Sequence, residues 1–139
     1  MSGIEEVQVM PQRYHIVCLS GTREKLQMAA MFASVAAATG DQVTVFFSMN
    51  ALPYFIKDST PRVPVEGQFG ELMENEAGVP PFKQLFQSAA ELGDAKLLPC
   101  SMALDLLKVT EDALDPVLGP ATGLTRFLSD AEGGQLLTF

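Results

Sequence analysis

The sequence predicts a three-layer α/β fold of the flavodoxin-like type, with a mainly parallel sheet of about five strands. Short apolar runs rich in β-branched residues alternate with longer segments of helical periodicity, and this alternation is typical of βαβ units. The strand-like runs are almost continuously apolar, which favours strands covered on both faces. We expect residues 1–139 to form a single domain, since a chain of this length can bury a core without disulfides.

The N-terminal part predicts a strand–helix–strand unit. After a polar tail over residues 1–13, residues 14–20 are expected to form the first strand. Residues 23–39 follow as a helix with an alanine-rich apolar stripe, which Thr22 is expected to cap. Residues 42–47 form the second strand, and the crossover between the two strands should be right-handed.

The next part of the chain is less regular. Residues 48–56 are apolar and predict a helical turn or two. Residues 57–80 carry repeated Pro and Gly, and they predict a long loop or a partly helical flap inserted into the domain. Loops of this length are often functional lids, and are otherwise disordered.

The C-terminal part continues the alternation of helices and strands. We expect two longer helices, a short helix, a strand that ends at a cysteine, a short fourth strand and a last strand at the C-terminus. In chain order, these are a helix over 81–92, a strand over 95–99, a short helix over 101–108, a strand over 115–118, a helix over 124–131 and a strand over 135–139.

Composition excludes several classes of function. The formal net charge of −8 argues against nucleic acid and against an anionic membrane surface, because both require a basic patch. The longest apolar run, residues 43–56, is too short for an integral membrane segment, and the N-terminus lacks the pattern of a signal peptide. Two separated cysteines and one histidine are too few for a zinc site and favour a reducing compartment. We therefore expect a cytoplasmic protein without a metal.

Cys100 is the candidate reactive residue. It stands between a predicted strand and a predicted helix, where the N–H groups of a first helical turn favour thiolate over thiol. In a parallel α/β sheet, ligands bind beyond the carboxyl ends of the strands, and free backbone N–H groups there can bind an anion. The residues expected to gather at that edge with Cys100 are Ser20, Gly21, Thr22, Asn50, Ser101, Met102, Gly119 and Thr122. The alternative is that Cys100 is a buried structural cysteine.

Two other residues bear on this chemistry. Cys18 lies within the first predicted strand and is expected to be a core residue, able to pair with Cys100 only if the first and third strands are neighbours. His15 is expected at the solvent-facing start of the first strand, roughly 16 Å from its far end, so it should not serve Cys100 as a base. A Cys–His hydrolase is therefore disfavoured.

Cofactor motifs are weak in this sequence. The turn after the first strand carries neither a P-loop nor a GxGxxG motif. A flavin mononucleotide site is compatible with the fold class, but the first loop is short of hydroxyl groups. We therefore expect no cofactor.

Several segments together resemble the DsrE/DsrF-like family of small sulfur-relay proteins, including its branch labelled peroxiredoxin. These are residues 16–22 with the alanine-rich helix, residues 43–47 followed by Asn50-Ala51-Leu52, the segment Leu97-Leu98-Pro99-Cys100-Ser101-Met102, and the Gly-rich approach to the last helix. The resemblance runs from about residue 14 to residue 139, and the cysteine segment is its most specific part.

The resemblance implies a flavodoxin-like sheet, assembly into homo- or hetero-oligomers, and a cysteine that carries sulfur. Members of the family look like carriers of persulfide or thiosulfonate groups, which they exchange with TusA-like proteins and rhodaneses. The cysteine position carries over to Cys100 alone, and its neighbours Pro99 and Ser101 provide no second thiol. Two alternatives stay open: a thiol redox protein that responds to peroxide, and a non-catalytic subunit that binds a partner while Cys100 stays inert.

Overall fold

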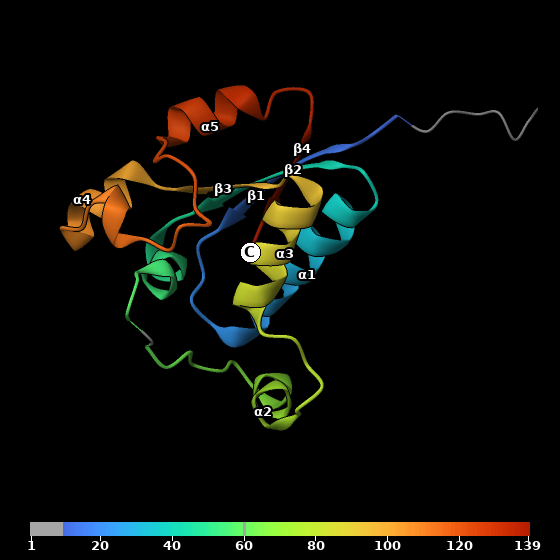
Figure 1. Ribbon diagram of the computed structural model, residues 1–139, viewed down its shortest axis with the longest axis vertical. Coiled ribbons are helices and arrows are strands. Elements are labelled where there is room, and N and C mark those ends of the chain that lie inside the picture. The colour runs from blue at the N-terminus through green and yellow to red at the C-terminus, as the bar shows by residue number, and fades with distance from the viewer. Residues whose placement is uncertain (1–9, 60) are drawn as a thin grey trace, which may run out of the picture.

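The computed structural model describes residues 10–59 and 61–139, and these form a parallel four-stranded sheet (Figure 1). The strand order is β3-β2-β1-β4, with β1 at Arg13–Cys18, β2 at Gln42–Phe47, β3 at Lys96–Pro99 and β4 at Gln135–Thr138. The predicted flavodoxin-like α/β class is confirmed, with four strands in place of about five. Residues 1–9 of the predicted tail lie outside the described part of the chain.

The strand order explains how the helices divide between the two faces. The crossovers from β1 to β2 and from β2 to β3 run in the same direction, so right-handed connections place α1 (Arg23–Ala38) and α3 (Phe82–Gly93) on the same face. The return to β4 runs the other way and places α5 (Leu124–Asp130) on the opposite face, as Figure 1 shows. One face is therefore covered by two long helices and the other by one short helix.

Successive side chains of the strands point to opposite faces of the sheet, and they fill the apolar layer on each face. On the first face, Phe47 of β2 meets Phe86 of α3 edge to face, with their ring centroids 4.9 Å apart. On the second face, Phe46 stacks on Phe127 of α5, also at 4.9 Å. The alanine stripe of α1 allows α3 to come very close, since a Cβ on Gly93 would lie 2.4 Å from the Cβ of Ala37. The core is therefore a dense α1–α3–sheet sandwich with a thinner α5 layer behind it.

The strand predicted over residues 115–118 is wrong. These residues form a turn in which the Leu118 N–H donates to the carbonyl of Asp115 at 3.1 Å, and Pro116 within it lacks the N–H that a strand ladder needs. The remaining elements are short helices, and none of the helices in the described residues is long and apolar enough to cross a membrane. They are η2 at Met49–Phe55, α2 at Gln68–Asn75, α4 at Ser101–Leu107 and η3 at Glu111–Ala113.

Residues 61–80 contain α2, and the part from Pro64 to Gly70 docks on the start of α1. The carboxylate of Glu24 accepts hydrogen bonds from the backbone N–H groups of Glu66, Gly67 and Gly70, at distances between 2.7 and 3.2 Å. These donors hold the pKa of Glu24 below its ordinary value. Thr22 precedes α1 as expected but makes no capping bond, because its hydroxyl donates to the carboxylate of Glu66. Figure 1 shows α2 at the bottom of the view, away from α4.

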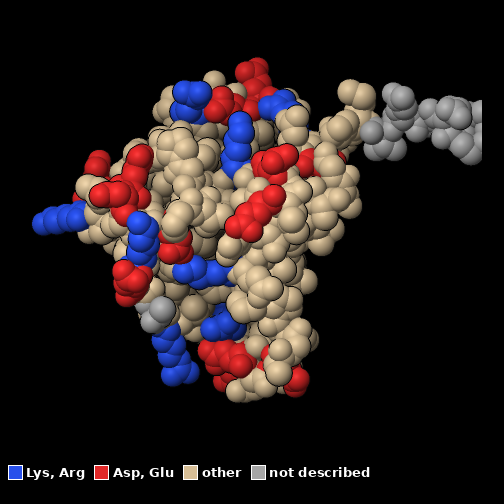
Figure 2. Space-filling view, in the orientation of Figure 1, with Lys and Arg blue, Asp and Glu red and all other residues tan. Residues whose placement is uncertain are grey.

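The surface carries both signs of charge. On the face seen in Figure 2, Lys and Arg side chains are interspersed among Asp and Glu side chains. Acidic residues outnumber basic ones in the chain, 17 to 9. A local cluster of basic side chains therefore departs from the acidic composition of this chain.

The docking of residues 57–80 depends on the charge of Glu24. We expect Glu24→Gln to loosen this segment, because a neutral amide oxygen is a weaker acceptor for three N–H groups than a carboxylate. Trypsin should then cleave after the exposed Arg62 faster than in the wild type. Glu132→Gln, which makes the same change at an exposed turn, is the control. Equal cleavage rates for all three proteins would contradict this account.

Candidate functional site

Cys100 lies at the junction of β3 and α4, and its backbone is tied on both sides. Its N–H donates to the carbonyl of Phe47 at 2.9 Å, which extends the pairing with β2 one residue beyond β3. On the other side, Cys100 forms a parallel bridge with Thr122. Its carbonyl accepts the Leu104 N–H at 3.1 Å and so begins α4. Three segments of the chain therefore hold this position.

The thiol of Cys100 is covered. The residue is 4% exposed and belongs to the hydrophobic core. Because side chains alternate along an extended strand, Cys100 is on the same side as Lys96 and Leu98, which is the α5 face of the sheet. Residues 119–122 run alongside the end of β3, held there by the parallel bridge at Thr122 and by the hydrogen bond from the Gly119 N–H to the Leu97 carbonyl.

The prediction of free backbone N–H groups around Cys100 is wrong at four positions. Each of these N–H groups donates to a carbonyl of the protein, because the bridge at Thr122 and the C-terminal strand extend the backbone pairing past the strand ends. The pairs are Ser101 with Thr122 at 2.9 Å, Thr122 with Pro99 at 3.0 Å, Gly119 with Leu97 at 2.6 Å and Ser20 with Phe139 at 3.3 Å.

Six of the eight residues predicted to gather with Cys100 form two groups. Ser101, Met102, Gly119 and Thr122 surround the β3–α4 junction with Cys100. Gly21 and Asn50 lie together where β1 and β2 end, since the Asn50 N–H donates to Leu19 at 3.1 Å and a Cβ on Gly21 would meet the Asn50 carbonyl at 2.5 Å. The Tyr54 hydroxyl donates to the Gly21 carbonyl at 2.8 Å and fixes this turn.

Cys18 is a sealed core residue. It is 0% exposed, and burial raises the pKa of its thiol to about 12. The register pairs Cys18 with Phe47 and Phe47 with Pro99, so β2 separates Cys18 from Cys100. Two strand spacings put their Cα atoms roughly 10 Å apart or more, which is too far for a disulfide. Both cysteines are free thiols.

His15 is buried, contrary to the expectation that it lies near solvent. It is 6% exposed, and its ring meets Phe127 edge to face at 5.7 Å, because α5 folds over this end of the sheet. Burial, and then the nearby Arg13, lower the pKa of His15, so it is neutral at neutral pH. The register aligns His15 with Thr44 and Lys96, four residues before Cys100, or roughly 13 Å along the strands. The register therefore keeps His15 away from the thiol.

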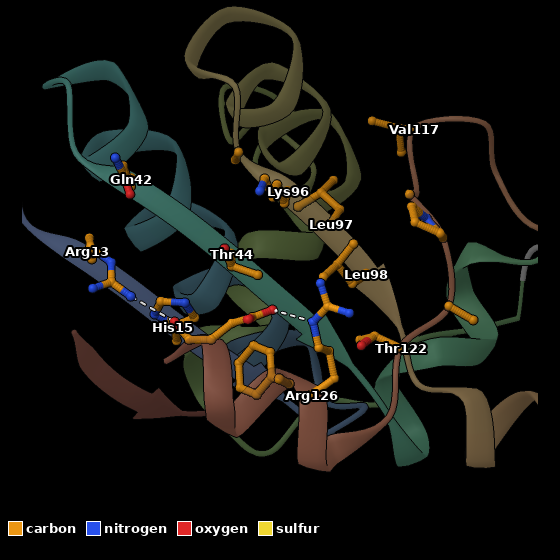
Figure 3. Close-up of a pocket in the computed structure, with 16 residues that line it drawn as sticks. Arg13, His15, Gln42, Thr44, Lys96, Leu97, Leu98, Val117, Thr122 and Arg126 are labelled. Carbon is orange, nitrogen blue, oxygen red and sulfur yellow. Dashed lines mark hydrogen bonds and ion pairs between the residues drawn. The ribbon is translucent and has the colours of Figure 1, made fainter. Parts of the chain in front are cut away.

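Sequence reasoning missed a cavity on the α5 face. Its volume is about 770 Å³, with a floor of side chains from β1, β2 and β3, and walls from α5 and from residues 117–122 (Figure 3). A signal for it was present, since alternate positions of these buried strands are polar: Arg13 and His15, then Gln42 and Thr44, then Lys96. Thr122 lines this cavity and also pairs with Cys100.

Comparison with known proteins places these features in a family. The model of the DsrE/DsrF-like family matches residues 12–139. The chain belongs to the DsrE/DsrF-like family. Among curated proteins, the uncharacterized protein YrkE of Bacillus subtilis (strain 168) is 30% identical, over 92% of this chain and 96% of that protein.

Two solved structures share the fold of this DsrE/DsrF-like chain. Protein MTH1491 of Methanobacterium thermoautotrophicum, described as of unknown function, has a TM-score of 0.60 over 92% of this chain and 99% of its own. The ychN protein of E. coli has a TM-score of 0.62 over 94% of this chain and 100% of its own. Both are 12% identical to this chain, so they show the fold alone.

Metal ligands do not gather in the described part of this DsrE/DsrF-like chain. Within residues 10–59 and 61–139, no three side chains of His, Cys, Asp or Glu lie together as a metal ion would require.

Because burial keeps the Cys18 thiol protonated, we expect the free energy of unfolding to fall at alkaline pH. The unfolded chain releases this proton from about pH 9, whereas the folded chain keeps it until the pH nears 12. Between these values the wild type should lose up to about 1.4 kcal/mol of unfolding free energy per pH unit relative to Cys18→Ala. Urea unfolding of both proteins from about pH 8 to about pH 10.5 measures this difference. If the unfolding free energies of the two proteins change in parallel with pH, the Cys18 thiol is not shielded from solvent in the folded protein.

Proposed function

We propose that this DsrE/DsrF-like protein carries sulfur on Cys100, as a persulfide or a thiosulfonate. The observation that carries the proposal is the contrast between its two thiols. Cys100 stands at a strand-to-helix junction, next to the short segment 119–123, whereas Cys18 lies inside the sheet with its pKa raised. Family membership supports a sulfur-relay role, and Cys100 is the thiol suited to it.

The chemistry of loading needs little beyond the thiolate. The sulfur of Cys100 attacks a sulfane sulfur of the donor, a new S–S bond forms, and the leaving sulfur departs with the electron pair of the broken S–S bond. The thiolate itself is the nucleophile, so the distance of His15 from Cys100 is no obstacle to this reaction.

Access to Cys100 requires movement of residues 119–123. The thiol is 4% exposed, so a donor reaches it when the pairing of Thr122 with Pro99 and Ser101 opens. The segment is held by these two hydrogen bonds, by the bond from the Gly119 N–H to Leu97 and by the bond from the Ala121 N–H to the Glu111 carboxylate. Each contributes about 1 kcal/mol in net terms, and such opening is common in irregular segments. The same segment then covers the adduct when it closes.

Transfer needs a second protein, since Cys18 does not reach Cys100 across β2. We propose a TusA-like carrier or a rhodanese as the donor or acceptor, in the cytoplasm. The same separation weighs against a peroxide-responsive protein that resolves a sulfenic acid with its own second thiol. Exposed apolar side chains on α1, those of Met28, Met31 and Val35, support assembly into a homo-oligomer.

Incubation with tetrathionate tests the loading step. We expect mass spectrometry of the wild type to show one thiosulfonate adduct, with thiosulfate as the leaving group, and peptide mapping to place it on Cys100. Cys18→Ala should accept the same adduct, and Cys100→Ser should accept none. If no adduct forms with tetrathionate or with polysulfide, or if it forms on Cys18, the proposal fails.

A further inference from the structure

The cavity on the α5 face gathers positive charge in an acidic protein. Of the nine Lys and Arg residues in the chain, Arg13, Lys96 and Arg126 all line it. Its one acidic residue is Asp130, in a chain whose formal net charge is −8. Three cations facing one carboxylate attract an anion into the cavity.

The single carboxylate does not neutralise the three cations. Arg126 pairs with Asp130, with its Nε 3.2 Å from Oδ2, and Arg13 donates from Nη2 to the backbone carbonyl of Asp130 at 2.7 Å (Figure 3). Lys96 forms no ion pair with any residue in the ranges 10–59 and 61–139. A ligand with an acidic group would supply the missing negative charge.

His15 adds a polar group whose partner is missing. Its Nδ1 is buried and makes no hydrogen bond within the described residues. This atom faces the backbone of Gly134, where a Cβ would come within 3.2 Å. An unpaired buried acceptor is tolerated better than an unpaired buried donor, which assigns the proton of the neutral ring to Nε2. His15 is one of the residues that line the cavity, so it adds a polar ring to the site.

The rest of the cavity suits an apolar body. Leu98 of β3, Val117 and Ala121 of the 117–122 segment, and Phe127 of α5 line it, while Gln42 and Thr44 add neutral polar groups. A volume of about 770 Å³ lies within the range of small-molecule sites. Size, lining and charge together describe a molecule with an acidic group and an apolar part.

We propose that this cavity binds a small organic anion, with its carboxylate, sulfonate or phosphate held by Lys96, Arg126 and Arg13, and its apolar part against Leu98, Val117 and Phe127. The site is distinct from Cys100, which does not line the cavity. It also does not depend on sulfur loading, so Cys100→Ser should bind the anion as the wild type does.

Titration with anilinonaphthalene sulfonate, a fluorescent aromatic sulfonate, tests the proposal. We expect saturable binding at one site, and much weaker binding of N-phenyl-naphthylamine, which has the same rings without the sulfonate. Lys96→Gln combined with Arg126→Gln should weaken binding of the sulfonate by about tenfold or more. Both residues are exposed at the rim, so the change should leave the fold intact. Arg62→Gln combined with Lys108→Gln removes the same charge from exposed sites elsewhere and should have little effect.

The pH dependence gives a second, independent readout in the unmodified protein. His15 faces Arg13, Lys96, Arg126 and Asp130 around the cavity, and burial and the nearby cations lower its pKa. Because its pKa is lowered, His15 takes up a proton only as the pH falls below the ordinary histidine value of about 6.5. That proton adds positive charge, so affinity for the sulfonate should rise over this acidic range, and His15→Gln should abolish the rise. Equal weakening in both double variants, equally tight binding of the uncharged probe, or no saturable binding would overturn the proposal.

Discussion

The backbone pairing around Cys100 joins three parts of the chain that are far apart in sequence. Phe47 at the end of β2 accepts the Cys100 N–H, and Thr122 bridges Cys100 from the other side. This pairing sets where α4 begins and holds residues 119–122 alongside the end of β3, at a position where Cys100 is buried. Because Thr122 also lines the cavity on the α5 face, one short segment both pairs with the backbone at Cys100 and forms a wall of the cavity.

The order of the strands accounts for the uneven cover of the sheet. Two crossovers in one direction place α1 and α3 on one face, and the single return crossover leaves α5 alone on the other. A seven-residue helix cannot cover three strands, so polar side chains of β1, β2 and β3 line a cavity beside it. Both the cationic cavity and the proposed sulfur-carrying residue lie on this thinly covered face, while the α1–α3 face supplies most of the apolar core.

Apolar periodicity predicted the fold because strands covered on both faces and amphipathic helices leave clear patterns, as in residues 14–20 and 23–39. It also placed Cys100 at the strand-to-helix junction. It did not predict the partner of the Cys100 segment, since the bridge to Thr122 depends on a contact between residues 22 positions apart. The burial of His15 depends on α5 folding back over β1, and the turn at 115–118 depends on Pro116, which strand propensity alone overlooked. The bridge to Thr122 and the burial of His15 are set by tertiary packing and leave no local pattern, whereas Pro116 is a local signal against a strand.

We propose that the Cys100 thiol becomes accessible in the folded protein through local opening of residues 119–123. The most direct test is the rate of alkylation of each cysteine in the native protein, resolved by peptide mass spectrometry and compared with the rate of global unfolding. The account predicts that Cys100 reacts much faster than the protein unfolds, while Cys18 reacts only at the unfolding rate. Modification of both cysteines together, at the rate of unfolding, would contradict it and would make Cys100 a structural core residue.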